Sequence, residues 1–212
     1  MVNGEALSFN EGSVHLSSGT NLTVNSSGGA ITFEKRIRDT NGQNFTVNAG
    51  DTAGSTDTAV FSGGIGFGDS LGAVSITAAD GISLGSGVHT TGNIAFTGPV
   101  TLTGGVTVDS NHSGTDGTVT FSSTIDGSGQ ALTIDSGSGA VLVQGAIGSG
   151  AALSSVTVNT SGAGTISLAN IGGTNSGVTG ATSVGNTDTE TLTLSGSTYN
   201  TTGTQEYTST SG

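Results

Sequence analysis

The chain lacks cysteine and tryptophan, has a single proline, and holds only three basic residues among its 212. Without cysteine there is neither a disulfide framework to indicate a redox compartment nor a thiol nucleophile. Three Lys and Arg against fifteen Asp and Glu give a formal net charge of −12. This balance argues against binding to nucleic acid, whose phosphates require cationic side chains, and against anionic membrane surfaces for the same reason.

Long apolar runs are also missing. No stretch approaches the ~20 residues of a membrane-spanning helix, and residues 1–20 have neither the basic nor the apolar region of a signal peptide. What is abundant is glycine, with 39 residues, together with serine, threonine and β-branched residues. Each of these disfavours helix for its own steric or entropic reason. Short strands joined by tight turns are therefore predicted, and the acidic, Ser/Thr/Gly-rich composition favours an extracellular location.

A degenerate repeat runs through the chain. Triplets of the form apolar-Thr/Ser-apolar recur at intervals of 23 to 32 residues, beginning at Leu22, Phe45, Val74, Val106, Leu132 and Val156. A second apolar pair follows each triplet, and a further apolar residue follows six positions after the start of that pair, as with Ile31, Phe33 and Ile37. Residues 89–105 break this spacing and predict a shortened turn. Such periods are typical of solenoids.

Period-2 pairs place two apolar side chains on one face of a strand and the intervening Thr or Ser on the other. Three short strands per repeat bury their inner faces only when successive turns stack in parallel. We therefore predict one all-β domain over residues 1–212, a parallel β-helix (β-solenoid) of about seven to eight irregular coils of roughly 23–32 residues each. A β-sandwich is the alternative, but the Asn-Gly and Asp-Gly hairpin turns that it favours are sparse.

A polar residue follows each of the six triplets. The positions concerned are Asn25, Asn48, Thr77, Asp109, Asp135 and Asn159. They predict either a ladder of side chains hydrogen-bonded from turn to turn or a simple preference of Asn and Asp for corners. In this register Asp109 and Asp135 stack on successive turns, where two carboxylates repel. Either water relieves the repulsion, or a calcium ion with oxygen ligands binds between them. Asp109 and Asp135 are therefore the candidate metal residues.

The lines "GTVTFSSTIDGSGQALTIDSGSGAVLVQGAIGSG" and "LSGSTYNTTGTQEY" resemble the β-strand-repeat segments of large bacterial surface proteins, of the filamentous haemagglutinin and autotransporter adhesin type. The resemblance covers the whole chain through a degenerate pattern. It implies a secreted, parallel β-helical, adhesive or structural protein with no catalytic residues.

Candidate chemistry is sparse. The three histidines, His15, His89 and His112, lie in different Gly/Ser/Thr contexts, and their spacing indicates neither a nucleophile nor a zinc site. The segment "GGIGFGDSL" only partly matches the calcium-binding nonapeptide, because Asp69 falls one position late. All basic residues lie in "EKRIRD" (34–39), where they are expected to pair with Glu34 and Asp39 or to contact an anionic partner.

Neither end of the chain reads as the capping helix that solenoids usually carry. The ends are thus expected to continue into further coils of the same chain or to stack on other copies. The sequence predicts a non-enzymatic, extracellular structural or adhesive rod that self-associates end to end, with a cell surface or a glycan as a further partner. The alternatives are a polysaccharide-binding or polysaccharide-degrading β-helix and a calcium-stabilised β-roll-like module.

Overall fold

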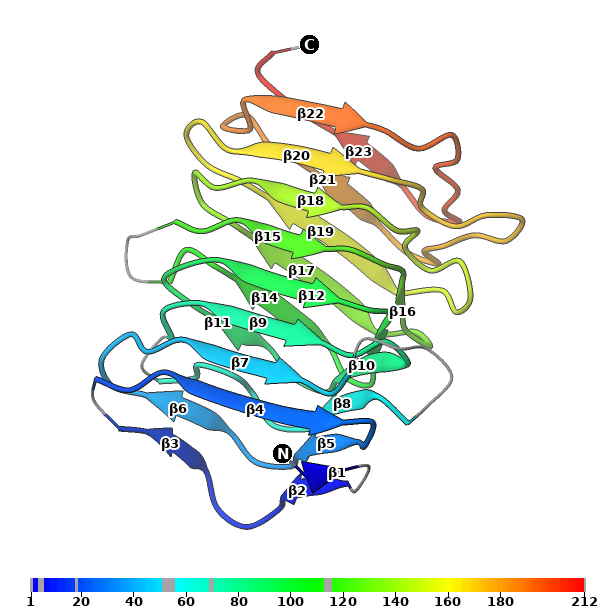
Figure 1. The fold of residues 1–212 in the computed structure, drawn as a ribbon. Helices are drawn as coiled ribbons and strands as arrows, with labels where there is room; N and C mark the ends of the chain where they lie inside the picture. The colour runs from blue at the N-terminus through cyan, green and yellow to red at the C-terminus, as the bar shows by residue number, and fades with distance from the viewer. Residues whose placement is uncertain are drawn as a thin grey trace.

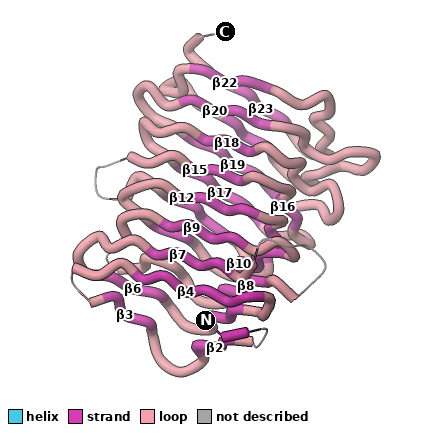
Figure 2. Tube along the Cα trace, in the orientation of Figure 1, coloured by secondary structure: helices cyan, strands magenta, loops and turns pink. Residues whose placement is uncertain are grey.

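The computed structural model describes residues 2–3, 6–17, 19–50, 56–68, 71–112 and 116–211. Within these residues every element is a short strand and every strand pairing is parallel; there is no helix (Figure 2). The strands wind through about eight turns that stack into a rod, with the two termini at opposite ends (Figure 1). The predicted parallel β-solenoid is confirmed.

Three sheets run along the rod, one on each face of the coil. Sheet 1 contains, in spatial order, β1 (Val2–Asn3), β4 (Leu22–Ser27), β7 (Phe45–Asn48), β9 (Val74–Thr77), β12 (Ile94–Thr97), β15 (Val119–Phe121), β18 (Val141–Val143), β20 (Thr165–Leu168) and β22 (Thr191–Leu194).

Sheet 2 begins at the N-terminal end with β2 (Leu7–Phe9), β5 (Ile31–Phe33), β8 (Thr58–Phe61), β10 (Gly81–Leu84), β13 (Val100–Leu102) and β16 (Ile125–Asp126). Single bridges extend it through Ile147 and Ile171 to Tyr199. Sheet 3 begins with β3 (Val14–Leu16) and β6 (Ile37–Asp39). It continues, through a bridge at Ile65, into β11 (Val88–His89), β14 (Val106–Asp109), β17 (Ala131–Asp135), β19 (Ser155–Asn159), β21 (Thr182–Val184) and β23 (Gln205–Tyr207).

The repeat of the sequence changes face in the middle of the rod. Leu22, Phe45 and Val74 are partners in sheet 1, whereas the later triplets, at Val106 and beyond, lie in sheet 3. The segment 89–105, which was expected to be a shortened turn, supplies β12 of sheet 1 and β13 of sheet 2, and β14 of sheet 3 follows directly after it. The six triplets therefore form two columns rather than one.

Because of this change, the predicted turn length needs correction. Along sheet 1 the turns range from 20 residues, between Val74 and Ile94, to 29 residues, between Phe45 and Val74. The interval of 32 residues in the sequence pattern joins two different faces and is not a turn. Gly98, at the corner between β12 and β13, has φ +128°, and a Cβ there would clash with the carbonyl group of Ala78 on the preceding turn. This corner therefore requires glycine.

The inward apolar side chains form one continuous core along the axis of the rod. In the N-terminal turns the rings of Phe9, Phe33 and Phe61 stack in a row, with centroid distances of 4.5 and 5.3 Å. Further along, Phe96 and Phe121 stack at 4.8 Å. The prediction that the recurring apolar pairs point inward is confirmed, and their burial supplies the main driving force for folding.

Candidate functional sites: the rod ends and a histidine–aspartate cluster

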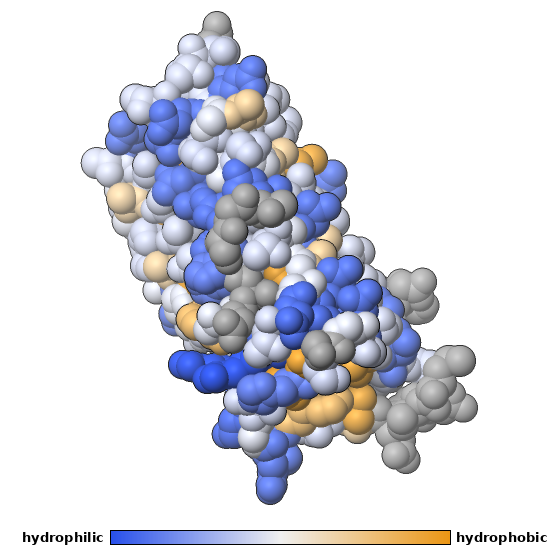
Figure 3. Space-filling model, turned by 90° about the vertical axis from the view of Figure 1, so that its left-hand side faces the viewer, coloured by the Kyte–Doolittle hydropathy of each residue, from blue (hydrophilic) through white to orange (hydrophobic). Residues whose placement is uncertain are grey.

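Among the residues that the structure describes, seven apolar side chains pack against the core but are only partly buried, and all of them lie at the two ends of the rod. They are Leu7, Phe9, Val14, Leu22, Leu192, Tyr199 and Tyr207. Leu194, in the last turn, is more exposed still, at 42%. Figure 3 shows hydrophobic surface gathered toward the N-terminal end of the rod, while the remainder of this face is mostly polar.

These terminal residues are the two ends of the same columns. Following the strand register from turn to turn, Leu22 and Leu192 belong to one column of sheet 1. Leu7 and Tyr199 belong to one column of sheet 2. Val14 and Tyr207 end one column of sheet 3. Each face of the coil thus presents an apolar residue at both ends of a single row.

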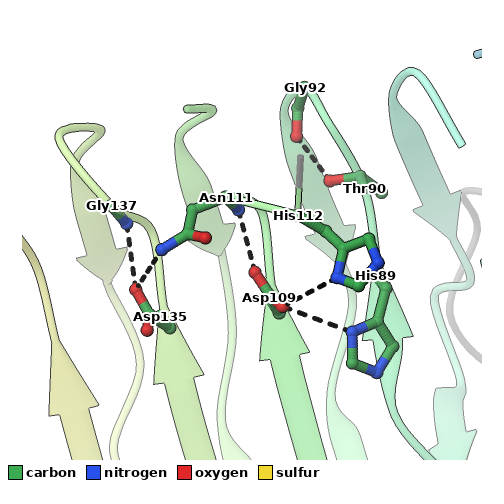
Figure 4. A network of polar contacts seen from close by, with 8 residues as sticks. All are labelled: His89, Thr90, Gly92, Asp109, Asn111, His112, Asp135 and Gly137. Atoms are coloured by element: carbon green, nitrogen blue, oxygen red, sulfur yellow. Dashed lines mark hydrogen bonds and ion pairs between the residues drawn. The ribbon is translucent and has the colours of Figure 1, made fainter. Parts of the chain in front are cut away.

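The predicted stacking of Asp109 and Asp135 is confirmed, since the two residues are partners at the ends of β14 and β17. Asn111 contacts both carboxylates (Figure 4). Its backbone N–H donates to Asp109 Oδ1 at 2.9 Å, and its side-chain amide donates to Asp135 Oδ1 at 3.0 Å. The N–H of Gly137 also donates to Asp135 Oδ1, at 3.0 Å. Protein donors thus bind both carboxylates; calcium between them stays a prediction.

The second oxygen of Asp109 faces two imidazoles. Asp109 Oδ2 lies 3.3 Å from Nδ1 of His89 and 3.5 Å from Nδ1 of His112 (Figure 4). His89 ends β11 and is the register partner of Asp109 on the preceding turn. The potential ligand atoms of the three residues all lie within 4.8 Å of one another. We call His89, Asp109 and His112 the histidine–aspartate cluster.

Backbone contacts hold this cluster in place. The N–H of His112 donates to the carbonyl of Thr90 on the preceding turn at 3.1 Å, and the N–H of His89 donates to Ile65 at 2.9 Å. The ring of Phe67 meets the His89 imidazole edge-on at 4.4 Å. His89 and Asp109 are largely buried, with side-chain exposures of 17% and 20%, whereas His112 is 45% exposed. The cluster therefore has one side open to solvent.

Sequence reasoning missed this cluster because it placed His89 and Asp109 at different points of the repeat. The signal was present in the similarity of "VH" at 88–89 to "VD" at 108–109, one turn of 20 residues apart. His112 could not be assigned from the pattern, because it lies in the loop after β14. His15 is an exposed residue of β3.

The polar ladder is present, divided between two faces. Asn48 donates its side-chain amide to Asn25 Oδ1 at 2.7 Å across neighbouring turns of sheet 1. Asp109, Asp135 and Asn159 form the corresponding row on sheet 3. A further row precedes the strands of sheet 1, where asparagine Oδ1 atoms accept backbone N–H groups of the next turn at 2.8 to 2.9 Å; its members are Asn21, Asn44 and Asn93.

The basic segment departs from expectation. Asp39 is 1% exposed and accepts backbone N–H groups of Thr40, Asn41 and Gln43. Lys35, Arg36, Arg38, Glu34 and Asp39 all lie in the described part of the chain, and no ion pair joins the basic members of this set to the acidic ones, so their expected pairing is wrong. Arg36 instead lies 5.5 Å from the centre of the Phe67 ring. A groove of about 410 Å³ here is lined by Gly12, Ser13, Glu34, Lys35, Arg36 and Gly63.

Asp69 of the partial calcium-binding nonapeptide lies outside the described residues.

Comparisons with protein-family models, with curated proteins and with solved structures find no match to this chain. In the part of the chain that the structure describes, no helix is long and apolar enough to cross a membrane. The function is therefore inferred from the geometry of the rod, of its ends and of the histidine–aspartate cluster.

Proposed function

We propose that the protein is a non-enzymatic structural rod that assembles head to tail, the last turn of one copy stacking on the first turn of the next. The observation that carries this proposal is the match of apolar columns at the two ends. Leu22 and Leu192, Leu7 and Tyr199, and Val14 and Tyr207 are half-buried members of common columns. A second copy placed in register would bury each residue as the interior turns bury theirs.

Strand edges support the same contact. The short strand β1 pairs with only the last two residues of β4, Ser26 and Ser27. At the other end a single bridge joins Ser211 to Thr191, the first residue of β22. The remaining main-chain groups of these edges can pair with a strand of another copy, as in β-strand addition. A head-to-tail contact of this kind does not close on itself and so builds a filament.

The charges at the two ends of the rod favour head-to-tail over tail-to-tail stacking. The last turns carry exposed acidic residues, Asp188, Glu190 and Glu206. All three cationic residues of the chain, Lys35, Arg36 and Arg38, lie within the first turns. Acidic residues such as Glu11 and Glu34 offset these cations, so the N-terminal end is less acidic rather than cationic. Head-to-tail stacking brings the three cations closer to the acidic end, whereas tail-to-tail stacking places acidic groups against each other.

An extracellular, surface-adhesive role is part of the proposal and is supported by the acidic, Ser/Thr/Gly-rich composition and by the resemblance to surface-protein repeats. The alternative of a polysaccharide-binding or polysaccharide-degrading protein is tested with acidic polysaccharides. Release of unsaturated products would contradict the non-enzymatic assignment.

Electron microscopy and sedimentation velocity of the full chain test the assembly. The wild-type protein is expected to form concentration-dependent filaments of uniform width. Leu194→Lys puts a charge into the contact and is expected to leave single rods. Thr120→Lys, on an interior strand of the same sheet with its side chain pointing outward, is the control and is expected to assemble normally. A wild-type protein that sediments as a monomer at all concentrations would contradict the proposal.

A further inference from the structure

We propose that the histidine–aspartate cluster binds one divalent first-row transition-metal ion of the zinc class, which links two neighbouring turns of the rod. This proposal is independent of end-to-end assembly, since the cluster lies in the interior turns. Two imidazole nitrogens and one carboxylate oxygen form a donor set suited to zinc and related ions. Calcium, by contrast, takes oxygen ligands.

The distances between the donor atoms fit such an ion. Two ligands held about 2.0–2.1 Å from zinc at the tetrahedral angle lie about 3.3 Å from each other. In the cluster, Asp109 Oδ2 lies 3.3 Å from His89 Nδ1 and 3.5 Å from His112 Nδ1. Both separations are longer than a typical N–H···O hydrogen bond of about 2.9 Å. The carboxylate oxygen is thus spaced from each imidazole nitrogen like a second ligand of one ion, and the ligand atoms of the three residues all lie within 4.8 Å of one another.

Two of the ligand residues, Asp109 and His89, are also held in place before any ion binds. Asn111 donates its backbone N–H to Asp109 Oδ1, which leaves Oδ2 directed at the imidazoles (Figure 4). The His89 ring packs edge-on against Phe67 at 4.4 Å, and the backbone N–H of His89 donates to the Ile65 carbonyl. Such second contacts orient metal ligands and raise metal affinity.

The position of the cluster explains what an ion would do there. His89 comes from one turn, and Asp109 and His112 come from the next. An ion bound to all three would link two adjacent strands of sheet 3. Because the unfolded chain does not hold these ligands together, the ion would stabilise the folded state. The 45% exposure of His112 leaves a path for the ion and for a water molecule as a fourth ligand.

Substitution of Asp135 distinguishes this assignment from the calcium prediction. Both use Asp109, but the zinc-class site needs the two histidines and leaves Asp135 to Asn111 and Gly137. Asp135→Asn should therefore preserve zinc binding, whereas it would remove a ligand of the calcium site.

The test is a zinc titration of the full chain without a histidine tag, in competition with a chromophoric chelator, together with thermal unfolding in zinc, in calcium and in EDTA. One zinc ion per chain is expected to bind and to raise the unfolding temperature. His112→Gln, in an exposed loop position that should not disturb folding, and Asp109→Asn are expected to weaken zinc binding by more than about tenfold. His15→Gln, the matched control outside the cluster, should leave it unchanged.

The proposal is overturned if zinc does not bind saturably, or if His112→Gln and His15→Gln reduce binding equally. It is also overturned if calcium, and not zinc, raises the unfolding temperature and Asp135→Asn abolishes that effect, since the site would then be the oxygen-ligand pair. Far-UV circular dichroism of each variant separates loss of ligand from loss of fold.

Discussion

The interior turns and the terminal turns of the rod are built from the same strand pattern but differ in burial. Leu168 and Leu194 occupy neighbouring positions of one column in sheet 1. Leu168 is completely buried, whereas Leu194 is 42% exposed. The strand that follows covers Leu168, while Leu194 has no such cover from the described residues. In this column burial is therefore supplied by the next turn rather than by the strand itself.

The N-terminal end repeats the comparison with aromatic rings. Phe33, stacked between Phe9 and Phe61, is 1% exposed. Phe9 is stacked on one side only and remains partly exposed. Each end thus presents an apolar surface that resembles a section through the core, and this likeness is the basis of the proposed assembly.

The largest expected effect is a difference in stability between alanine variants of Leu168 and Leu194. Leu168→Ala should lower the free energy of unfolding by about 2–5 kcal/mol, because it leaves a cavity in a fully buried position. Leu194→Ala should lower it by much less in dilute, unassembled protein. Urea denaturation measures both values. Equal losses of stability for the two variants would mean that Leu194 is as well buried in solution as Leu168, which would contradict the proposed exposed end.

A smaller effect is expected for the ladder that joins the turns. Asn48→Ala removes the amide that donates to Asn25 at 2.7 Å and should cost about 0.5–1.5 kcal/mol of stability. Asn175→Ala, at an exposed loop position, is the control and should cost little. If both substitutions are neutral, the row of amides does not contribute to cohesion between turns.

Tyr207 reports on the terminal turn through its ionisation. Burial, and to a smaller extent the neighbouring Tyr199, raises the pKa of the Tyr207 hydroxyl above 10.0. The folded chain thus holds this proton more tightly than the unfolded chain. Stability should therefore fall as the pH rises from 10.0 through the raised value. Head-to-tail stacking should raise the pKa further, which ultraviolet titration of dilute and assembled protein can detect. An unchanged pKa on assembly would place Tyr207 outside the contact.

The smallest effect concerns an exposed contact between interior turns. Asp116 accepts hydrogen bonds from the Ser138 hydroxyl and backbone N–H, and these lower the pKa of its carboxyl below 3.8. The contribution to stability is present above that pH and is lost as the pH falls through the lowered value. Ser138→Ala should move the pKa back toward 3.8 in an NMR titration of the carboxyl group. A pKa that does not respond to this substitution would rule out the Ser138 hydroxyl as its cause.

The stacked parallel architecture could be predicted because alternating apolar residues show which side of a strand faces the core. The pattern does not show to which of the three sheets a strand belongs. The shift of the triplets from sheet 1 at Val74 to sheet 3 at Val106 could therefore not be predicted. The stacking of Asp109 on Asp135 was predicted correctly because both residues follow triplets of the same sheet, sheet 3. His112 escaped prediction because its loop, and not the repeat, brings it to His89.

Head-to-tail stacking is tested most directly by disulfide cross-linking, since the chain has no cysteine of its own. Thr23 and Thr193 lie at opposite ends of one outward column of sheet 1, where stacked neighbours fall within reach of a disulfide. The double variant Thr23→Cys with Thr193→Cys should oxidise to a ladder of covalent multimers. Thr46→Cys with Thr193→Cys, whose first position lies one turn inside, should give none. Equal cross-linking in both variants, or none in either, would contradict the account.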